Sequence, residues 1–563
     1  MMMNEKISLL HLAWLLEKSN IRHLVISPGS RNAPIITIIN NKTDIKCHTI
    51  VDERSAAFFA LGIAQQLNQT VAIVCTSGSA VLNYAPAIAE AYYQRVSLLV
   101  LTADRPVEWI DQADGQTIRQ QNIFSNYIRK SVQLPQNITN NDDLWYNDRL
   151  INEAILATRF PVPGPVHINI PIREPLYGFD QEMNDIPRQI ALVPVKAMID
   201  TSEVKSFAAI WNKSQRKMIL IGQHEVDQTL NNQLIELSKD PSVIILTETI
   251  SNMHHPDFIG CIDRCLGIVN RNSSGFEPDL LLTTGGAVVS KQIKTFLRKA
   301  GIQHHWHIDP TEYLVDTYQH LTFGIPLDPS VFFGQLLPEI KHLSSSFSGD
   351  WQSVAVKAKA IHQQYLADCG YSDLKIFEAI FGSLPEDFNV QIANSTPVRY
   401  AQLFDYQYNY RMFSNRGTSG IDGCVSTAAG AASASNHPTL VISGDLGFFY
   451  DSNALWNSAL PANLKIIVIN NEGGGIFRFL PGPDTTGLLE SHFEARQQLS
   501  VKNIASTFDV NYYTADNLTS LLAVLPDFFK TSSEAALLEI NSPAEDSANV
   551  LRDYFTFLKK EEN

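Results

Sequence analysis

Short apolar runs alternate with helix-length segments along most of the chain, and this pattern predicts parallel α/β sheets. Polar stretches near residues 180–198 and 344–350 divide the runs into three groups. We therefore expect three doubly wound parallel-sheet domains, over residues 1–182, 195–342 and 350–563. The apolar runs that predict strands are 23–27, 70–74, 97–103 and 165–172 in the first group, 217–222, 242–248, 279–286 and 304–309 in the second, and 390–394, 439–443, 465–470 and 536–540 in the third.

Composition narrows the class of protein. The chain has 563 residues, of which 45% are hydrophobic and 18% charged, and its formal net charge is −15. This acidity argues against binding to nucleic acid or to anionic membranes. The first 20 residues predict an amphipathic helix, because they lack the small-residue cleavage site of a signal peptide. No apolar run reaches the roughly 18 residues of a membrane span, so we expect a cytoplasmic protein.

Several common binding motifs are missing. The six cysteines show neither the spacing of a metal site nor that of a disulfide framework. The sequence also contains no G-x-G-x-x-G fingerprint and no G-x-x-x-x-G-K-[ST] loop, so a dinucleotide site or a P-loop is not supported.

Polar residues follow two neighbouring runs in the third group. Gly444 and Asp445 come directly after run 439–443, while Asn471 and the glycines from Gly473 follow run 465–470. Open parallel sheets bind ligands at the carboxyl ends of their strands. Carboxylate and amide oxygens suit Mg²⁺, and glycines let backbone approach phosphates closely. The sequence therefore predicts a metal-bridged diphosphate site, with Asp445, Asn471 and the Gly473 carbonyl on the metal; the alternative is an ordinary sheet with two loops.

Cationic and polar side chains gather after other strands. Because an arginine can hold a carboxylate through two parallel hydrogen bonds, several of them in an acidic chain predict one or two substrates rich in carboxylates. For any single arginine the alternative is a solvated residue or an internal ion pair. The candidates are Ser30 and Arg31, Arg105 with Gln116 downstream, Lys291, Ser395 with Arg399 four residues later, and Arg416.

Two distant segments resemble the thiamin-diphosphate-dependent enzymes. Gly444-Asp445-Leu446 followed by Asn470-Asn471 resembles their Gly-Asp-Gly and Asn-Asn signature, from which Leu446 departs. The upstream segments IVDERSAAFFALGIAQ and VAIVCTSGSAVLNYAPAIAEAYY resemble the other half of the same site. The resemblance implies that Glu53 hydrogen-bonds the aminopyrimidine ring, which requires a protonated carboxyl in a poorly hydrated site. The alternative is a carboxylate placed at a helix start by the helix dipole.

Further motifs select one branch of these enzymes. SPGSRNAP, DERSAAFFALG, SNRGTSGIDG and GDL with NNEGGGIF resemble the family of 2-succinyl-5-enolpyruvyl-6-hydroxy-3-cyclohexene-1-carboxylate synthases over nearly the whole length. The resemblance implies decarboxylation of 2-oxoglutarate and 1,4-addition of the succinyl carbanion to isochorismate, in menaquinone biosynthesis. It also implies Mg²⁺ or Mn²⁺ as the metal. The assembly it implies is a homodimer or homotetramer with active sites at the dimer interface.

The same resemblance assigns roles to individual residues. It directs Arg399 and Arg416 to the succinyl intermediate or the acceptor, and Arg31, Arg105 and Lys291 to the acceptor's entry side. It makes Ile421 a wedge under the bent cofactor, and makes Ile476 and Phe477 an apolar wall that limits water. The implied cofactor contacts are Glu53, Thr76, Asn83, Ser419, Gly420, Ile421, Gly444, Asp445, Leu446, Asn471, Gly474, Ile476 and Phe477.

Two other functions compete with this one. A related decarboxylase or acetolactate-type synthase would share the cofactor. However, no histidine lies between His48 and His167 to supply the histidine pair of pyruvate decarboxylases, and acetolactate synthases do not need so many arginines. A non-catalytic cofactor-binding regulator would have little reason to keep Glu53, Asp445 and Asn471.

Overall fold

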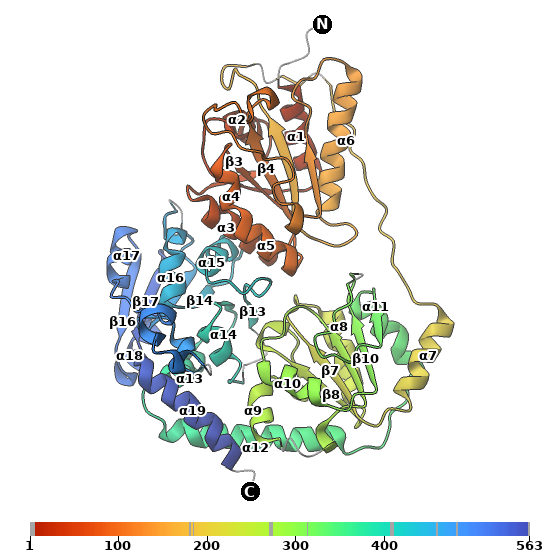
Figure 1. Ribbon diagram of the computed structural model, residues 1–563, viewed down its shortest axis with the longest axis vertical. Coiled ribbons are helices and arrows are strands. Elements are labelled where there is room, and N and C mark those ends of the chain that lie inside the picture. Colours follow the sequence, from red (N-terminus) through yellow and green to blue (C-terminus); the bar gives the residue numbers. More distant parts are fainter. Residues whose placement is uncertain are drawn as a thin grey trace.

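Three parallel sheets with helices on both faces make up the computed structural model (Figure 1). It describes all residues except 1–5, 180–181, 184, 270–273, 312, 406–409, 458–459, 480–481 and 561–563. The sheets confirm the expected class of fold. The first has the strand order β2-β1-β3-β4-β6-β5, the second β11-β10-β9-β7-β8, and the third β13-β12-β14-β15-β17-β16.

The N-terminal sheet and its helices come first in the chain. The strands are β1 (His23–Ile26), β2 (Lys46–Thr49), β3 (Val71–Cys75), β4 (Leu98–Asp104), β5 (Lys130–Gln133) and β6 (Val166–Pro171). The helices are α1 (Ile7–Lys18), α2 (Ala33–Lys42), α3 (Glu53–Leu67), α4 (Ser79–Asn83), α5 (Ala85–Gln94) and α6 (Asn141–Ala157). Helix α1 confirms the helix expected at the start of the chain.

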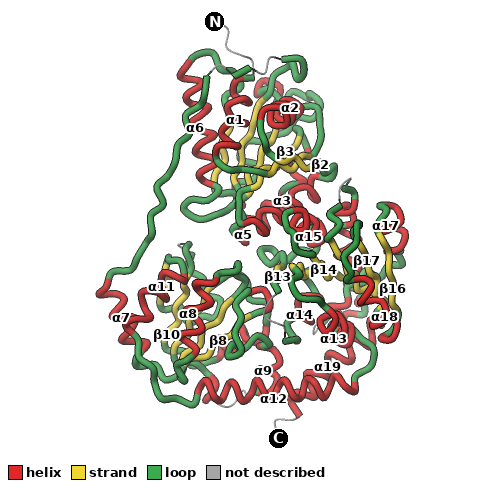
Figure 2. The backbone as a smooth tube through the Cα atoms, turned by 180° about the vertical axis from the view of Figure 1, so that it is seen from behind, coloured by secondary structure: helices red, strands yellow, loops and turns green. Residues whose placement is uncertain are grey.

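The middle sheet follows a long connection. Its strands are β7 (Lys217–Ile221), β8 (Val243–Thr247), β9 (Leu280–Thr284), β10 (His304–Ile308) and β11 (Phe323–Ile325). Its helices are α7 (Thr201–Trp211), α8 (Gln228–Ser238), α9 (Ile262–Ile268), α10 (Lys291–Lys299) and α11 (Pro329–Leu336). Helix α12 (Phe347–Asp368) then runs along the base of the molecule from the middle domain to the C-terminal domain (Figure 2).

The C-terminal sheet repeats the strand order of the N-terminal one. Its strands are β12 (Asn389–Ile392), β13 (Arg411–Phe413), β14 (Thr439–Gly444), β15 (Leu464–Asn470), β16 (Asn511–Ala515) and β17 (Ala536–Asn541). Its helices are α13 (Asp373–Ser383), α14 (Thr396–Ala401), α15 (Cys424–Ser433), α16 (Asp445–Tyr450), α17 (Val501–Thr507), α18 (Leu518–Phe528) and α19 (Ala544–Lys560).

Burial separates most central strands from the outer ones, although the edge strand β8 is also buried along its whole length. All residues of β3, β4, β7 and β9 are buried, as expected for parallel strands covered on both faces. The sequence pattern predicted these strands. It did not predict β2, β5, β11, β13 or β16, each of which lies at the edge of its sheet. An edge strand has one open side and needs no continuous apolar run, so its signal is weaker.

The N-terminal and C-terminal domains dock through helices α3 and α15. The two backbones approach so closely that a Cβ at Gly62 would lie 1.9 Å from the Thr427 carbonyl oxygen. A Cβ at Gly430 would likewise lie 1.9 Å from the Phe59 carbonyl oxygen. Glycine at both positions therefore permits this crossing, and any larger residue would push the domains apart.

None of the helices in the described part of the chain combines the length and the apolar character that crossing a bilayer requires.

Candidate active site

Three neighbouring strands of the C-terminal sheet end at one cavity. Strand β14 lies between β12 and β15, so the residues after these strands meet at one edge of the sheet. The cavity has a volume of about 360 Å³. Residues expected at the site that line it are Ser395, Arg399, Arg416, Ser419, Ile421, Gly444, Asp445, Leu446, Asn471, Gly473, Gly474, Ile476 and Phe477.

Two oxygens in this cavity have no hydrogen-bond donor. Asp445 is 1% exposed and one of its oxygens, Oδ1, accepts the Leu446 N–H at 2.8 Å. The other, Oδ2, and Oδ1 of Asn471 are buried and have no hydrogen-bond partner among the described residues. Burial raises the pKa of Asp445 to about 7. A divalent cation would satisfy both oxygens and favour the ionised carboxylate, so the donor set fits the metal expected from the sequence.

The glycine loop beside Asn471 is packed against its own domain. A Cβ at Gly473 would lie 2.7 Å from the Glu494 carbonyl oxygen, so a larger residue could not occupy this position without moving the loop. The Gly474 N–H donates to the same oxygen at 2.7 Å. The Gly473 carbonyl accepts the Gly475 N–H at 3.0 Å and keeps a second lone pair for a metal.

Two guanidinium groups lie on the other side of the cavity. Arg399, in α14, donates to the carbonyl of Ser395, the residue that directly precedes this helix. Arg416 donates to Asn394 Oδ1 at 3.0 Å, while its buried Nε has no partner in the described residues. Burial lowers the pKa of both arginines, and the charge of Arg416 lowers that of Arg399 further. Neither guanidinium forms an ion pair with a carboxylate of the described residues, so an anionic ligand could bind both.

Apolar side chains supply another part of the cavity lining. Ile421 packs at the floor, where a Cβ on Gly447 would touch its Cβ at 3.6 Å. Ile476 and Phe477 lie in a single 3₁₀ turn directly after the glycines. Gly420 does not line the cavity, but its carbonyl accepts from Asn394 Nδ2 at 2.6 Å and so helps to hold the loop that carries Ile421.

A second group of expected residues lies at the matching edge of the N-terminal sheet. The Arg31 N–H donates to Thr76 Oγ1 at 3.3 Å, and the Arg31 side chain donates to the Ile172 carbonyl at 3.0 Å. Burial lowers the pKa of Arg31, and the charge of the nearby Arg105 lowers it further. Arg105 itself forms an ion pair with Asp114 at 3.6 Å.

The remaining N-terminal residues are more open. Ser30, Asn83 and Gln116 are exposed, and the backbone of Gln116 would meet a Cβ on Gly78 at 3.4 Å. Gln116 therefore lies against Gly78 in the loop after β3.

Glu53 is the first residue of α3 and is partly buried. Burial raises the pKa of its carboxyl, with a smaller effect from the charge of Asp52, which is the direction the proposed proton role requires. The residues on either side bind the C-terminal domain: Asp52 accepts from Asn453 at 2.6 Å, and Arg54 donates to the Tyr450 carbonyl at 2.6 Å. The Glu53 carboxyl interacts with its own backbone N–H, which partly offsets the rise of its pKa.

The two groups do not meet inside one chain. The residues that line the C-terminal cavity all come from the C-terminal domain. Neither Glu53 nor Arg31 nor Arg105 is among them. The structure thus brings together the metal ligands, the glycine loop and two arginines, and it leaves the N-terminal residues in a separate group.

Lys291 belongs to neither group and begins α10 in the middle domain. The loop before it is held by Glu248, which is 2% exposed and accepts the N–H groups of Val289 at 2.5 Å and Ser290 at 2.7 Å. Burial raises the pKa of Glu248 to about 7. The sequence analysis missed Glu248, which is the acidic last residue of predicted strand 242–248.

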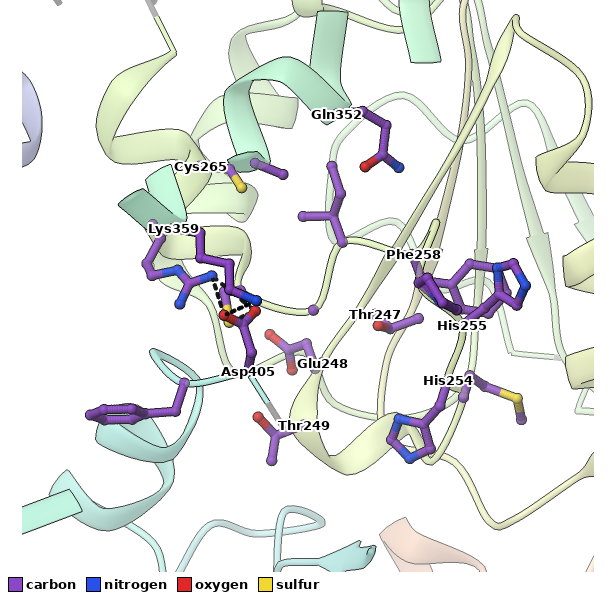
Figure 3. A pocket seen from close by; sticks show the side chains of 18 of the residues that line it. Thr247, Glu248, Thr249, His254, His255, Phe258, Cys265, Gln352, Lys359 and Asp405 are labelled. Carbon is purple, nitrogen blue, oxygen red and sulfur yellow. Dashed lines mark hydrogen bonds and ion pairs between the residues drawn. The ribbon is translucent and has the colours of Figure 1, made fainter. Parts of the chain in front are cut away.

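Another cavity, of about 330 Å³, lies between the end of β8, α9 and α12 (Figure 3). Arg264 donates to both oxygens of Asp405, at 3.0 and 3.1 Å, and Lys359 lies 3.6 Å from the same carboxylate. None of the site residues expected from the sequence lines this cavity.

Comparison with known proteins agrees with this geometry. Residues 10–125 match the model of the N-terminal TPP binding domain of thiamine pyrophosphate enzymes, and residues 395–540 match that of their C-terminal TPP binding domain. Residues 195–387 match the corresponding middle domain. The two half-sites described above thus fall in the two domains whose models are named for the cofactor.

Full-length relatives identify the branch. A 2-succinyl-5-enolpyruvyl-6-hydroxy-3-cyclohexene-1-carboxylate synthase from Flavobacterium johnsoniae is 43% identical over 95% of this chain and 96% of its own length. The chain belongs to this synthase family. The Porphyromonas gingivalis synthase is 39% identical over 97% of this chain and 96% of its own length. The Bacteroides thetaiotaomicron synthase is 37% identical over 99% of this chain and 100% of its own length. Membership in the synthase family confirms the resemblance and the enzyme class inferred from the sequence.

Proposed function

We propose that the protein decarboxylates 2-oxoglutarate and adds the succinyl unit to isochorismate by 1,4-addition. The product is 2-succinyl-5-enolpyruvyl-6-hydroxy-3-cyclohexene-1-carboxylate, in menaquinone biosynthesis. The observation that carries the proposal is the C-terminal cavity, where two unpartnered oxygens and two partly buried arginines share one space. A metal-bound diphosphate suits the oxygens, and a substrate with two carboxylates suits the arginines.

Asp445, Asn471 and the Gly473 carbonyl would hold Mg²⁺ or Mn²⁺, and backbone at Gly444, Leu446 and Gly474 would border the diphosphate. Thiamin diphosphate supplies an electron sink for the decarboxylation of a 2-oxo acid. Ile421 lies at the floor of the same cavity and would support the cofactor there. Its position between the metal ligands and the arginines favours this role.

Glu53 would come from a second copy of the chain. Its own chain keeps it apart from the C-terminal cavity, so one copy cannot complete the site. A two-fold dimer would place the N-terminal face of each copy, with Glu53, Ser30, Arg31, Arg105 and Gln116, over the C-terminal cavity of the other. The raised pKa of Glu53 keeps more of its carboxyl protonated, so it could share a proton with the cofactor's ring.

The other side chains would bind and shield the substrates. Arg399 and Arg416 would hold carboxylates, while Ser395 at the start of α14 would lie beside them. Ile476 and Phe477 would exclude water from the reacting carbon, because water would otherwise protonate it before the acceptor arrives. Arg31, Arg105 and Lys291 would guide the acceptor.

Some details stay predictions from the sequence: the domain limits 1–182, 195–342 and 350–563, a dimer rather than a tetramer, and a cytoplasmic location.

Purified protein would test the function directly. Isochorismate consumption should be followed with 2-oxoglutarate, Mg²⁺ and thiamin diphosphate, each omitted in turn. We expect consumption only with all components present, and formation of an acetolactate-type product from pyruvate would instead support the competing function.

A further inference from the structure

A buried carboxylate of the N-terminal domain lies behind the loop that carries Arg416. Glu90 belongs to helix α5, which lies where the N-terminal domain faces the other two domains (Figure 1). The residue is 0% exposed, and glutamates are almost never buried to this extent unless they are paired. The partners of this carboxylate should therefore explain its position.

Those partners are mainly backbone and side-chain groups of the C-terminal domain. One oxygen of Glu90, Oε1, accepts the Gly417 N–H at 2.7 Å. The other, Oε2, accepts the N–H of Thr418 at 2.6 Å and its hydroxyl at 2.5 Å. Gln94, one turn later in α5, also donates to Oε1. Because a carboxylate has about four acceptor positions, these four donors saturate Glu90.

The loop is also packed against the backbone of α5. A Cβ at Gly417 would lie 2.7 Å from the Glu90 carbonyl oxygen, so a larger residue would push the loop away from the helix. Gln94 donates to the Ser414 carbonyl at 3.3 Å, and Gln223 of the middle domain donates to the same carbonyl at 3.0 Å. Side chains from the two other domains of the chain therefore hold this loop.

Asn394 holds the loop from the side of the cavity. Its Nδ2 donates to the carbonyls of Asn415 and Gly420 at 2.6 Å each, and its Oδ1 accepts from Arg416 at 3.0 Å. Arg416 thus lies between two fixed points, Asn394 at the cavity and Glu90 behind the loop.

Electrostatics link the same groups. Burial lowers the pKa of Arg416, and the charges of Glu248 and Glu90 partly offset this effect. Glu90 therefore stabilises the charged guanidinium as well as the backbone next to it.

We propose that Glu90 is a positioning residue for Arg416, which it orients by fixing the backbone of the next two residues. The inference rests on the proposed function, in which Arg416 holds a carboxylate of the substrate. Glu90 itself does not line the cavity. The N-terminal domain thereby acts on the pocket of its own chain through Glu90, in addition to the role proposed for Glu53 in the pocket of a second copy.

Hydrogen exchange of the complete protein tests the contact itself. Glu90→Gln keeps the size of the side chain but replaces one acceptor oxygen with an NH₂ group, so at least one backbone N–H loses its acceptor. Amides of segment 414–420 should exchange about tenfold faster, whereas those of strand β14 should be unchanged. Glu153→Gln is the matched control, because Glu153 lies on α6 of the same domain and pairs with Lys130; it should leave segment 414–420 as in the wild type.

A double-mutant cycle tests whether Glu90 acts through Arg416. The kcat/KM for 2-oxoglutarate, at saturating isochorismate, should fall about tenfold in Glu90→Gln. The same change should cost less than about twofold when it is made in Arg416→Ala. A purely structural role would lower kcat/KM by the same factor in both backgrounds. Thr418→Val removes only the hydroxyl bond and should lower kcat/KM about threefold, which provides a second variant if Glu90→Gln does not fold.

The outcomes separate this inference from the proposed function. In an active enzyme, unchanged exchange of segment 414–420 in Glu90→Gln would overturn the positioning role, and so would equal factors in the two backgrounds. Faster exchange, together with a larger loss of kcat/KM when Arg416 is present, would support it. A wild type that does not consume 2-oxoglutarate would refute the proposed function and, with it, the positioning role, whatever the exchange shows of the contact.

Discussion

The N-terminal and C-terminal sheets share one strand order but present their polar residues differently. After β12, β14 and β15 the chain forms a cavity in which Asp445 and Asn471 keep unpartnered oxygens. After β1, β3 and β4 the chain forms an open face. Its arginines are held by their own domain, Arg31 by the Ile172 carbonyl and Arg105 by Asp114. The same topology therefore supplies a pocket in one domain and a complementary face in the other.

This difference explains how two related domains can divide one site. In the proposed site, the pocket would bind a charged group, and its buried, unpartnered oxygens suit a cation. The face would approach a ligand held by another copy, and partners in its own domain hold its two arginines in place. The following predictions test this division, beginning with the largest expected effect.

Glu53→Gln should affect proton transfer more than any other change at the face. The amide keeps the shape of the carboxyl but cannot carry the proton, so exchange of the cofactor's thiazolium proton should slow by about 10²- to 10⁴-fold. Exchange can be followed by NMR in deuterated buffer. Glu203 is also in the first turn of its helix, so Glu203→Gln is the matched control. Equal rates in both variants would show that Glu53 is only a helix-start carboxylate.

Arginines on the two sides should affect different measurements. Arg105→Ala should raise the KM for isochorismate by about ten- to a hundredfold, which corresponds to about 1.5–3 kcal/mol for a charge-assisted contact. Slow decarboxylation of 2-oxoglutarate without acceptor should persist. Arg416→Ala in the pocket should impair the binding of the succinyl intermediate, because this arginine is proposed to hold one of its carboxylates.

Paired steady-state kinetics would separate these effects. Arg119 lies in the same segment as Arg105, and its side chain is 82% exposed. Arg119→Ala should change neither the KM for isochorismate nor the rate of decarboxylation. Loss of decarboxylation in Arg105→Ala, with the affinity for isochorismate intact, would contradict the proposed role of Arg105 in binding the acceptor.

Asp445→Ala should weaken cofactor binding by at least about tenfold, or roughly 1.4 kcal/mol, because it removes the only charged side chain among the three expected metal ligands. Calorimetry with thiamin diphosphate and Mg²⁺ would measure this affinity. Chelation of the metal should weaken cofactor binding to the wild type in the same way. Cofactor affinity that is unchanged in the variant would remove Asp445 from the metal site.

Mixing two inactive variants would show whether the face and the pocket come from different copies. In hybrids of Glu53→Gln and Asp445→Ala chains, one of the two sites would be intact and the other would carry both defects. Random exchange should thus restore about a quarter of wild-type activity. If each chain completed its own site, the mixture would stay inactive after exchange, and the two-copy arrangement would be wrong.

The sequence predicted strands correctly where their residues are deeply buried. Runs such as 465–470 are central strands of the sheet, and the polar residues after them lie at strand ends as expected. The pattern missed β2, with its residues Lys46 to Thr49, and the Arg411–Phe413 strand, because half-exposed edges tolerate polar side chains. It also missed Glu248, since a single acidic residue carries no signal of the two backbone N–H groups it will accept.

The sequence by itself determined the class of fold and the residues at the ends of its strands. The short apolar runs are buried as strands, and the polar residues that follow them therefore lie at the strand ends. Tertiary structure alone decided that β14 lies beside β15, that α19 lines the same cavity as Arg399 of α14, and that Glu53 stays outside the pocket of its own chain. These arrangements depend on packing between residues far apart in sequence, such as the contact of Gly62 with α15, and no local pattern encodes such contacts.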